Sequence, residues 1–318
     1  MKKAAIFFAF LPLILGGCFS SKSGKKNTSN ITTNNTSNDS SLTSQNIANS
    51  STSKTSSNSG QNPEITKNCG VFLGAGHEDT AKIFGYELIC VDLDEFSSED
   101  ITILKQKNQK IYAYLSCGSL ESYRSYYEEF KDITFADYEN WPDEKWVDVS
   151  QMSWQNHIIS EANRLVSLGA DGLFLDNFDV YDVVLYGEYT VEFLDGIYNG
   201  LHTMMENLAT LNIELIMNSG SSFLFVLYLL QEDLLHSITY YCQEEVYSKI
   251  VDYDNDVFGT QDSEEHEYYL EAIDMLKDDL KIILLEYTTD EALISEITSF
   301  CIANNYYYYI SSHVDLTV

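Results

Sequence analysis

Eight short apolar runs, separated by stretches with helical periodicity, constrain the fold of this 318-residue chain more than any other feature. Most of the runs are nearly continuous Val, Ile, Leu and Tyr, which is typical of parallel strands covered on both faces. Eight strand–helix repeats predict an α/β fold, a closed (β/α)8 TIM barrel, with an open doubly wound sheet as the alternative. The runs are residues 70–74, 88–92, 111–116, 172–176, 213–218, 237–243, 281–286 and 306–311.

Start and stop signals for helices lie between these runs. Ser97 or Ser98 is placed to cap one helix, and two acidic residues follow in its first turn. Ser153 is expected to cap a second helix, which Gly169 ends. A third helix is predicted over residues 290–303 from the spacing of its apolar side chains.

The N-terminus carries the features of an export signal. Lys2 and Lys3 precede an apolar run at residues 4–15, which is too short to span a bilayer and ends in Leu-Gly-Gly-Cys18. This ending resembles the lipobox of bacterial lipoproteins, and the alternative is an ordinary secretory signal. The resemblance implies that residues 1–17 are a signal peptide and that Cys18 is lipidated, with palmitate among the expected acyl groups. We therefore expect a protein anchored to the bacterial membrane, at the cell surface or in the periplasm.

Residues 18–66 and 67–318 differ sharply in composition. The first segment is mostly Ser, Thr, Asn, Lys and Gly, which cannot form a core, so we expect a disordered linker that acts as a tether. Residues 67–318 are long enough for one barrel domain with a sizeable core. We expect this domain to be a monomer.

The balance of charge excludes some partners. The chain has 49 acidic residues against 18 Lys and Arg, a formal net charge of −31, which disfavours binding to nucleic acid. The six histidines are scattered without a metal-binding spacing, so we expect no catalytic metal. Residues 70–76 contain glycines but no complete dinucleotide-binding fingerprint, and we expect no cofactor.

Carboxylate and amide side chains cluster where the predicted strands end. In a (β/α)8 barrel these ends converge on one mouth, where the chemistry is carried out. Like charges brought together there raise some pKa values, which supplies a protonated acid beside an ionised carboxylate. A single acidic residue at the end of a strand is at least as often a helix cap or a solvated loop residue as a catalytic group. The prediction of an active site therefore rests on several such residues occurring together. These residues are Asp92, Asp94, Glu121, Asp176, Asn177, Asp179, Asn218, Gln243, Glu244, Glu245, Glu286 and Tyr287.

Four stretches together resemble glycoside hydrolase family 114, the endo-α-1,4-polygalactosaminidase family. They are YLSCGSLESYR at 114–124, NWPDEKWVD at 140–148, GADGLFLDNFDVY at 169–181 and YCQEEV at 241–246. The seventh run ends in LEY at 285–287, which is also similar. The resemblance covers most of residues 67–318 in the same order, and it implies a TIM-barrel glycoside hydrolase.

By position, the resemblance makes Asp176 and Glu244 the catalytic pair. Cleavage of a glycosidic bond needs one carboxylic acid to protonate the leaving oxygen and one carboxylate near the oxocarbenium-like transition state. We assign Asp176 as the nucleophile or charge stabiliser and Glu244 as the general acid/base, with the reverse assignment left open. Retention or inversion depends on the separation of the two carboxyls.

The resemblance also implies a set of substrate-binding residues, each with a structural alternative. Glu121 and Arg124 can hold sugar hydroxyls or pair with each other. Asp179 and Tyr181 are expected to shape the mouth beside the catalytic pair. Asn218 can donate to a sugar hydroxyl or cap the next helix.

Two further pairs of residues are expected to contact the sugar. Asp92 and Glu286 are expected to bind a substrate amine, because a carboxylate is the natural partner of an ammonium group. Trp141 and Tyr287 are expected to stack on the apolar faces of sugar rings, although Trp141 can instead pack a long loop.

The leading functional hypothesis is an endo-acting hydrolase of an extracellular polysaccharide, with galactosamine as the implied sugar. One alternative is a non-catalytic carbohydrate-binding lipoprotein that keeps the barrel mouth without turnover. Another is a hydrolase of a different glycan, because barrel folds host many substrates.

Overall fold

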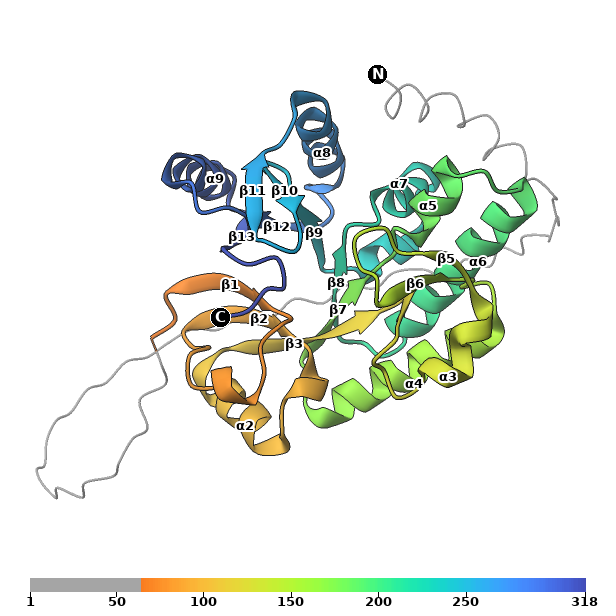
Figure 1. The fold of residues 1–318 in the computed structure, drawn as a ribbon, viewed down its shortest axis with the longest axis horizontal. Coiled ribbons are helices and arrows are strands. Elements are labelled where there is room, and N and C mark those ends of the chain that lie inside the picture. The colour runs from red at the N-terminus through yellow and green to blue at the C-terminus, as the bar shows by residue number, and fades with distance from the viewer. Residues whose placement is uncertain (1–63) are drawn as a thin grey trace, which may run out of the picture. The chain divides into compact units, whose positions relative to one another are not determined.

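The computed structural model describes residues 64–318, in which parallel strands alternate with helices (Figure 1). The expected signal peptide, Cys18 and nearly all of the linker lie outside the described residues. The described residues form one compact unit. The main sheet has eight strands, in the order β1 (Lys67–Phe72), β2 (Tyr86–Val91), β3 (Lys110–Ser116), β7 (Gly172–Asp176), β8 (Glu214–Asn218), β9 (Tyr240–Glu244), β12 (Lys281–Tyr287) and β13 (Tyr307–Ser311).

Every hydrogen-bonded strand pair in this sheet is parallel, and the sheet curls until its two edges meet. Asn68 Nδ2 at the β1 edge donates to the Tyr306 carbonyl, 3.4 Å away, beside β13. The rings of Phe72 and Tyr309 pack edge to face across the same seam, with centroids 5.1 Å apart. The sheet is therefore a nearly closed barrel, and the predicted TIM-barrel fold is confirmed.

Helices cover the outside of the barrel and lie between successive strands. The first strand connection departs from the expected repeat, because β1 and β2 are joined through a 3-10 turn, η1 (His77–Asp79), in place of an α-helix. Three further 3-10 turns are η2 (Leu93–Glu95), η3 (Lys131–Ile133) and η4 (Asp233–Ser237). The helices are α2 (Ser98–Lys107), α3 (Tyr127–Phe130), α4 (Met152–Leu168), α5 (Val180–Tyr186), α6 (Val191–Ala209), α7 (Ser221–Leu230), α8 (Ser263–Leu276) and α9 (Glu291–Asn304).

The predicted helix ends are mostly confirmed. Ser97 caps α2 and forms a reciprocal capping box with Asp100, and Gly169 ends α4 with a φ of 117°, which favours glycine. Ser153 is not the cap of α4, so that prediction is wrong. The carboxylate of Asp148 accepts from the backbone N–H of Ser150, and this turn leads the chain into the helix before Ser153.

Two small antiparallel sheets were not predicted, and both lie in connections between barrel strands. One contains β4 (Ser119–Glu121), β6 (Glu144–Val147) and β5 (Thr134–Asp137), and the other is the hairpin of β10 (Ser248–Asp252) and β11 (Val257–Thr260). They follow β3 and β9, so both extend the chain beyond the ends of barrel strands.

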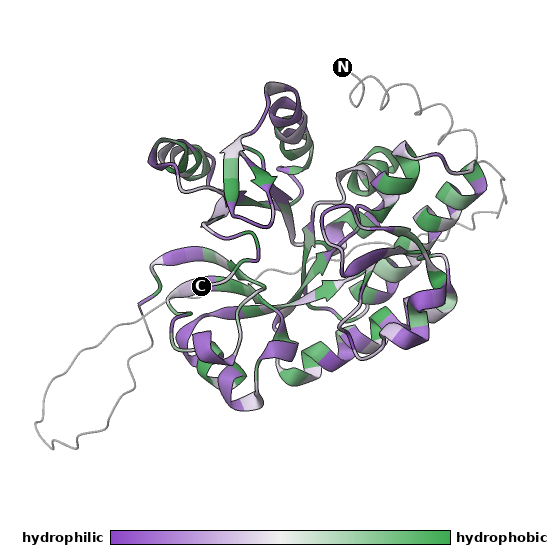
Figure 2. Cartoon of the chain, in the orientation of Figure 1, coloured by the Kyte–Doolittle hydropathy of each residue, from purple (hydrophilic) through white to green (hydrophobic). Residues whose placement is uncertain are grey.

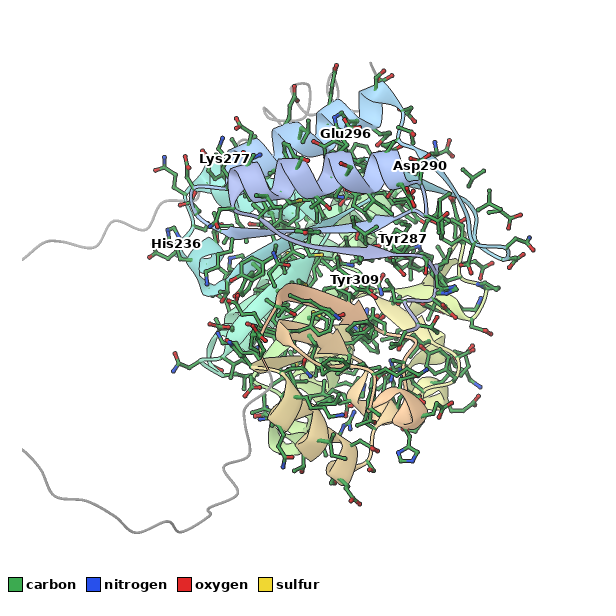
Figure 3. All side chains as sticks on the ribbon, turned by 90° about the vertical axis from the view of Figure 1, so that its left-hand side faces the viewer. His236, Lys277, Tyr287, Asp290, Glu296 and Tyr309 are labelled. Atoms are coloured by element: carbon green, nitrogen blue, oxygen red, sulfur yellow. The ribbon has the colours of Figure 1, made fainter. Side chains whose placement is uncertain are left out.

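The core has two layers because successive side chains on a strand point to opposite faces. Inside the barrel lie alternate residues of the eight strands, such as Leu88 and Cys90 on β2 or Ile283 and Leu285 on β12. The residues between them pack outward against helices that present apolar faces to the sheet and polar faces to solvent (Figure 2). Helix α9, for example, covers β12 and β13, and Tyr287 lies at the end of the barrel where α9 begins (Figure 3).

All five cysteines of the described part of the chain are buried free thiols. Within residues 64–318 no helix has both the length and the apolar character needed to cross a membrane.

Candidate active site

A cavity of about 390 Å³ opens at the C-terminal ends of the barrel strands. We call it the barrel cavity. Its walls carry eight carboxylates and seven aromatic rings, and none of the described residues that line it is Lys, Arg or His. The carboxylates are Asp92, Glu121, Glu144, Asp176, Asp179, Glu244, Glu245 and Asp315. The aromatic residues are Tyr114, Tyr123, Tyr138, Trp141, Tyr253, Tyr269 and Tyr287.

Strand periodicity explains which polar residues reach this cavity. Asp176 follows Phe174 by two positions, so its side chain continues the inward-facing row of β7. Asn218 and Glu244 stand in the same relation to Ile216 and Cys242 on the next two strands. Three neighbouring strands therefore end with an inward-facing polar side chain at one rim.

Asn218 joins the two predicted catalytic carboxylates. Its Nδ2 donates to Oδ1 of Asp176, at 2.9 Å, and to Oε1 of Glu244, at 2.6 Å. Because both bonds share one nitrogen, the two carboxylate oxygens cannot be farther apart than these two lengths combined. The hydroxyl of Tyr287 donates to the other oxygen of Glu244, at 2.6 Å. The structure thus brings Asp176, Glu244, Asn218 and Tyr287 together.

Burial and like charges raise the pKa values of the carboxyls in this group. Burial, followed by the charge of Glu244, raises the pKa of Asp176 to about 7. Burial also raises the pKa of Glu244, against the hydrogen bonds from Asn218 and Tyr287, which favour its ionised form. Raised pKa values among neighbouring carboxyls favour a protonated acid beside an ionised carboxylate, the combination that acid-assisted cleavage requires.

Arg124 neutralises part of the rim without lining the cavity. Its guanidinium pairs with Glu121 and with Asp92, the latter at 2.8 Å, and also reaches Asp94 at 3.3 Å. Glu121 and Asp92 both line the barrel cavity, and both are almost completely buried. The sequence left open whether Glu121 and Arg124 hold sugar hydroxyls or pair with each other. In the structure the two side chains form an ion pair.

Asp179 and Tyr181 were expected together at the mouth, but only Asp179 lines the cavity. One of its carboxylate oxygens accepts from the backbone N–H of Gly220, at 3.1 Å. Tyr181 is 3 % exposed and packs between the rings of Tyr198 and Phe223. It lies on helix α5, whose inner face turns Tyr181 into the core, so its position gives it a packing role.

Glu286 also lies away from the barrel cavity, which corrects the expectation that it binds a substrate amine. Its side chain is completely buried on the outer face of β12, because its neighbour Tyr287 faces inward. The carboxylate accepts from the backbone N–H groups of Tyr247 and Ser248 and from the Ser248 hydroxyl. It thereby fixes the turn between β9 and the β10–β11 hairpin.

We expect Glu286→Ala to lower the free energy of unfolding by roughly 2–6 kcal/mol, because two buried N–H groups lose their acceptor at about 1–3 kcal/mol each. Glu286→Gln keeps one acceptor oxygen and should lose less. Urea denaturation of both variants measures the difference. Unchanged stability combined with a raised KM would show instead that Glu286 contacts substrate.

Several cavity residues were not predicted as site residues. Glu144 accepts from the Ser119 hydroxyl at 2.6 Å, and burial raises its pKa to about 7. Glu144 lies within the segment 140–148, which carries part of the family resemblance, and this membership was the sequence feature that could have identified it as a site residue. Trp141, from the same segment, was expected either to stack on a sugar ring or to pack a long loop. It lines the cavity and packs edge to face against Tyr253 of the β10–β11 hairpin, with centroids 5.9 Å apart. No local pattern marks Tyr253.

No group of three or more His, Cys, Asp or Glu side chains in residues 64–318 is arranged to hold a metal ion.

Comparison with known proteins agrees with this geometry. No curated protein sequence matches the chain. Among solved structures, the glycoside hydrolase domain of PelA from Pseudomonas aeruginosa superimposes with a TM-score of 0.66 at 17 % identity, over 79 % of this chain and 96 % of that domain. Ega3 from Aspergillus fumigatus, in a complex with galactosamine, has a TM-score of 0.60 at 16 % identity, over 82 % of this chain and 96 % of Ega3.

These likenesses establish the barrel fold, and the family model establishes the family. The model for glycoside hydrolase family GH114 matches residues 49–311, which is most of the chain. The resemblance found in the four sequence motifs is thereby confirmed. This chain belongs to glycoside hydrolase family GH114 and is a glycoside hydrolase.

Proposed function

We propose that this hydrolase makes internal cuts in an extracellular polysaccharide rich in galactosamine with free amino groups. The observation that carries the proposal is the lining of the barrel cavity, with eight carboxylates and no Lys, Arg or His among the described wall residues. A protonated amine is the natural partner of such a surface, whereas a uronic acid would be repelled. The galactosamine in the Ega3 complex agrees with this choice of sugar.

We further propose that Asp176 and Glu244 act as a retaining pair. Carboxyls about 5–5.5 Å apart are typical of retention, and inversion needs roughly 6.5–9.5 Å to admit a water molecule. The shared bonds of 2.9 and 2.6 Å to Asn218 set an upper limit on the separation of the nearest oxygens that lies below the range for inversion, which supports retention. Products released with the anomeric configuration of the substrate, followed by NMR, would support this geometry, and inverted products would contradict it.

Hydrogen-bond partners support the assignment of roles. Tyr287 can either donate to Glu244 or accept from it, because a tyrosine hydroxyl does both, so Glu244 can carry a proton without losing this contact. Asp176 accepts from the Asn218 amide and the backbone N–H of Asn177, which only donate and favour its ionised form, against the burial and the Glu244 charge that raise its pKa to about 7. The pKa of Asp176 alone would suit the reverse assignment, so the roles rest on these hydrogen-bond partners. Glu244 then protonates the leaving oxygen, while Asp176 attacks the anomeric carbon. In the second half, Glu244 takes a proton from the water that releases the sugar from Asp176.

A screen for new reducing ends tests the proposed function. Purified protein is incubated with a de-N-acetylated galactosamine polymer, its N-acetylated form and neutral polysaccharides. We expect reducing ends from the de-N-acetylated polymer, with a rapid fall in chain length that marks internal cleavage. Binding without release from any of these polymers would favour the non-catalytic carbohydrate-binding alternative.

The positive charge of the substrate should also affect how kcat and kcat/KM depend on pH. A bound ammonium group lowers the pKa of Asp176, which is about 7 in the free protein. The acid limb of kcat, which reports the substrate complex, should therefore lie at lower pH than the acid limb of kcat/KM, which reports the free enzyme. Steady-state rates between pH 4 and 9 measure both limbs. Coincident limbs would mean that no ammonium group binds near Asp176.

Export and lipid attachment at Cys18 remain part of the proposal. Labelling of the expressed protein with a palmitate analogue, compared with Cys18→Ala, tests them.

A further inference from the structure

A second cavity, of about 420 Å³, adjoins the barrel cavity on the side of β1 and β2. We call it the side cavity. Leu73, Gly74, Asp92 and Tyr123 line both cavities, so the two share a wall. Each has the volume that is typical of a small-molecule site. The side cavity is therefore adjacent to the cavity that contains Asp176 and Glu244.

Tyr123 stands on the shared wall and offers an apolar surface. Its side chain is 64 % exposed, although two contacts hold it in place. The hydroxyl donates to Glu121, at 2.7 Å, and the Arg124 guanidinium lies 5.1 Å from the ring centroid. A fixed and exposed ring is suited to stack on the apolar face of a pyranose or to meet an ammonium group over its π-system.

The side cavity is also negatively charged. Two of its carboxylates are neutralised, because Asp79 pairs with Lys82 and Asp92 pairs with Arg124. Glu78 and Glu95 are exposed carboxylates that line the side cavity but not the barrel cavity. Within the described part of the chain no Lys or Arg lines either cavity, and His77, which lines the side cavity, pairs with Asp100 at 2.9 Å.

We propose that the side cavity binds a second amino-sugar unit, adjacent to the unit held over Asp176 and Glu244. Tyr123 is the stacking platform for this unit, and Glu78 and Glu95 supply the charge that attracts its ammonium group. This inference rests on the proposed function, because it assumes a cationic amino-sugar polymer. It adds a subsite, and with it a dependence of the rate on substrate length.

The test uses the double variant Glu78→Gln/Glu95→Gln in the full-length protein, because neither residue lines the barrel cavity. The rate is measured on de-N-acetylated galactosamine oligomers of increasing length. We expect KM to rise about 3- to 10-fold for oligomers long enough to fill both cavities, with kcat nearly unchanged, because the variant removes two solvent-exposed ion pairs that are each of modest strength. The shortest cleaved oligomers should keep their KM.

Two further comparisons separate charge from stacking. Glu188→Gln/Glu192→Gln changes the net charge equally at exposed residues outside both cavities, and it should leave KM unchanged at every length. Tyr123→Phe keeps the ring but loses the hydroxyl contact with Glu121, so it should raise KM for long oligomers much less than Tyr123→Ala does.

The outcomes distinguish the two proposals. If the unaltered protein cleaves oligomers but Glu78→Gln/Glu95→Gln matches it at every length, the side cavity is not a subsite and the proposed function stands. Equal effects from Glu188→Gln/Glu192→Gln would also overturn the subsite, because overall charge would then explain the result. If the unaltered protein cleaves no oligomer, the proposed function and the subsite both fall.

Discussion

Replacement of Glu244 by Gln is expected to lower kcat/KM by about 10²- to 10⁴-fold, the usual contribution of a general acid/base. Asp176→Asn should lose at least as much, because it removes the atom that we expect to form the covalent intermediate. Both substitutions preserve the shape of the side chain and leave a group that Asn218 still contacts. Thermal unfolding should therefore stay close to that of the unaltered protein, and binding of the polymer should persist. Release of reducing ends measures the loss.

Azide separates the two roles. When the acid/base is removed, as in Glu244→Ala, added azide attacks the glycosyl-enzyme and should give a glycosyl azide with the configuration of the substrate. When the nucleophile is removed, as in Asp176→Ala, azide attacks the substrate directly and should give the opposite configuration. The reverse pattern would exchange the roles.

Glu245→Gln is the matched control for Glu244, because the two residues are adjacent and both line the cavity. Glu245 accepts from the backbone N–H of Ile250, so its carboxylate is engaged with the β10–β11 hairpin. We expect a much smaller loss of kcat than in Glu244→Gln. A larger loss in Glu245→Gln would move the catalytic role one residue along the chain.

Replacement of Asn218 by Ala should lower kcat by about 10- to 100-fold, because a hydrogen bond to a charged group is worth about 1.5–3 kcal/mol. Asn218 holds down the pKa values of Asp176 and Glu244. Without it both pKa values rise, so the acid limb of kcat/KM should move to higher pH. A purely structural role for Asn218 would leave the pH profile unchanged.

Asn218→Ser gives an intermediate test, because one hydroxyl proton can serve only one carboxylate at a time. Its kcat should fall between those of the unaltered protein and Asn218→Ala. Stability should fall only modestly, because the bonds lost from the two carboxylates are partly offset by removal of the Asn218 Oδ1, which is buried without a partner among the described residues. Loss of the folded state in both variants would argue that Asn218 supports the barrel.

The barrel and the rim were predictable because both follow from simple periodicity. Parallel strands buried on both faces appear as continuous apolar runs, and Asp176 and Glu244 end two such runs in phase with the interior. Glu286 and Tyr287 show where prediction failed. Adjacent residues on a strand face opposite ways, so both could not reach the cavity, and Glu286 is the one that faces out.

Contacts between distant segments were beyond the reach of the sequence pattern. Tyr181 belongs to the segment that contains Asp176, but only the packing of α5 on Tyr198 and Phe223 decides which way its ring points. Tyr253 reaches the cavity from the turn of the β10–β11 hairpin, and the Asp- and Asn-rich residues 252–256 predict a turn but not which way the Tyr253 ring points. The two hydrogen bonds from the Asn218 nitrogen to Asp176 and Glu244 depend on the register of three strands, and apolar runs alone do not determine that register.

The most direct measurement is a crystal structure of the Glu244→Gln protein with a bound galactosamine oligomer. One glycosidic linkage should lie between the two residues, with its oxygen in hydrogen-bond reach of the substituted amide and its anomeric carbon facing the Asp176 carboxylate. An ordered oligomer whose linkages all lie beyond reach of either side chain would contradict a shared catalytic role for this pair.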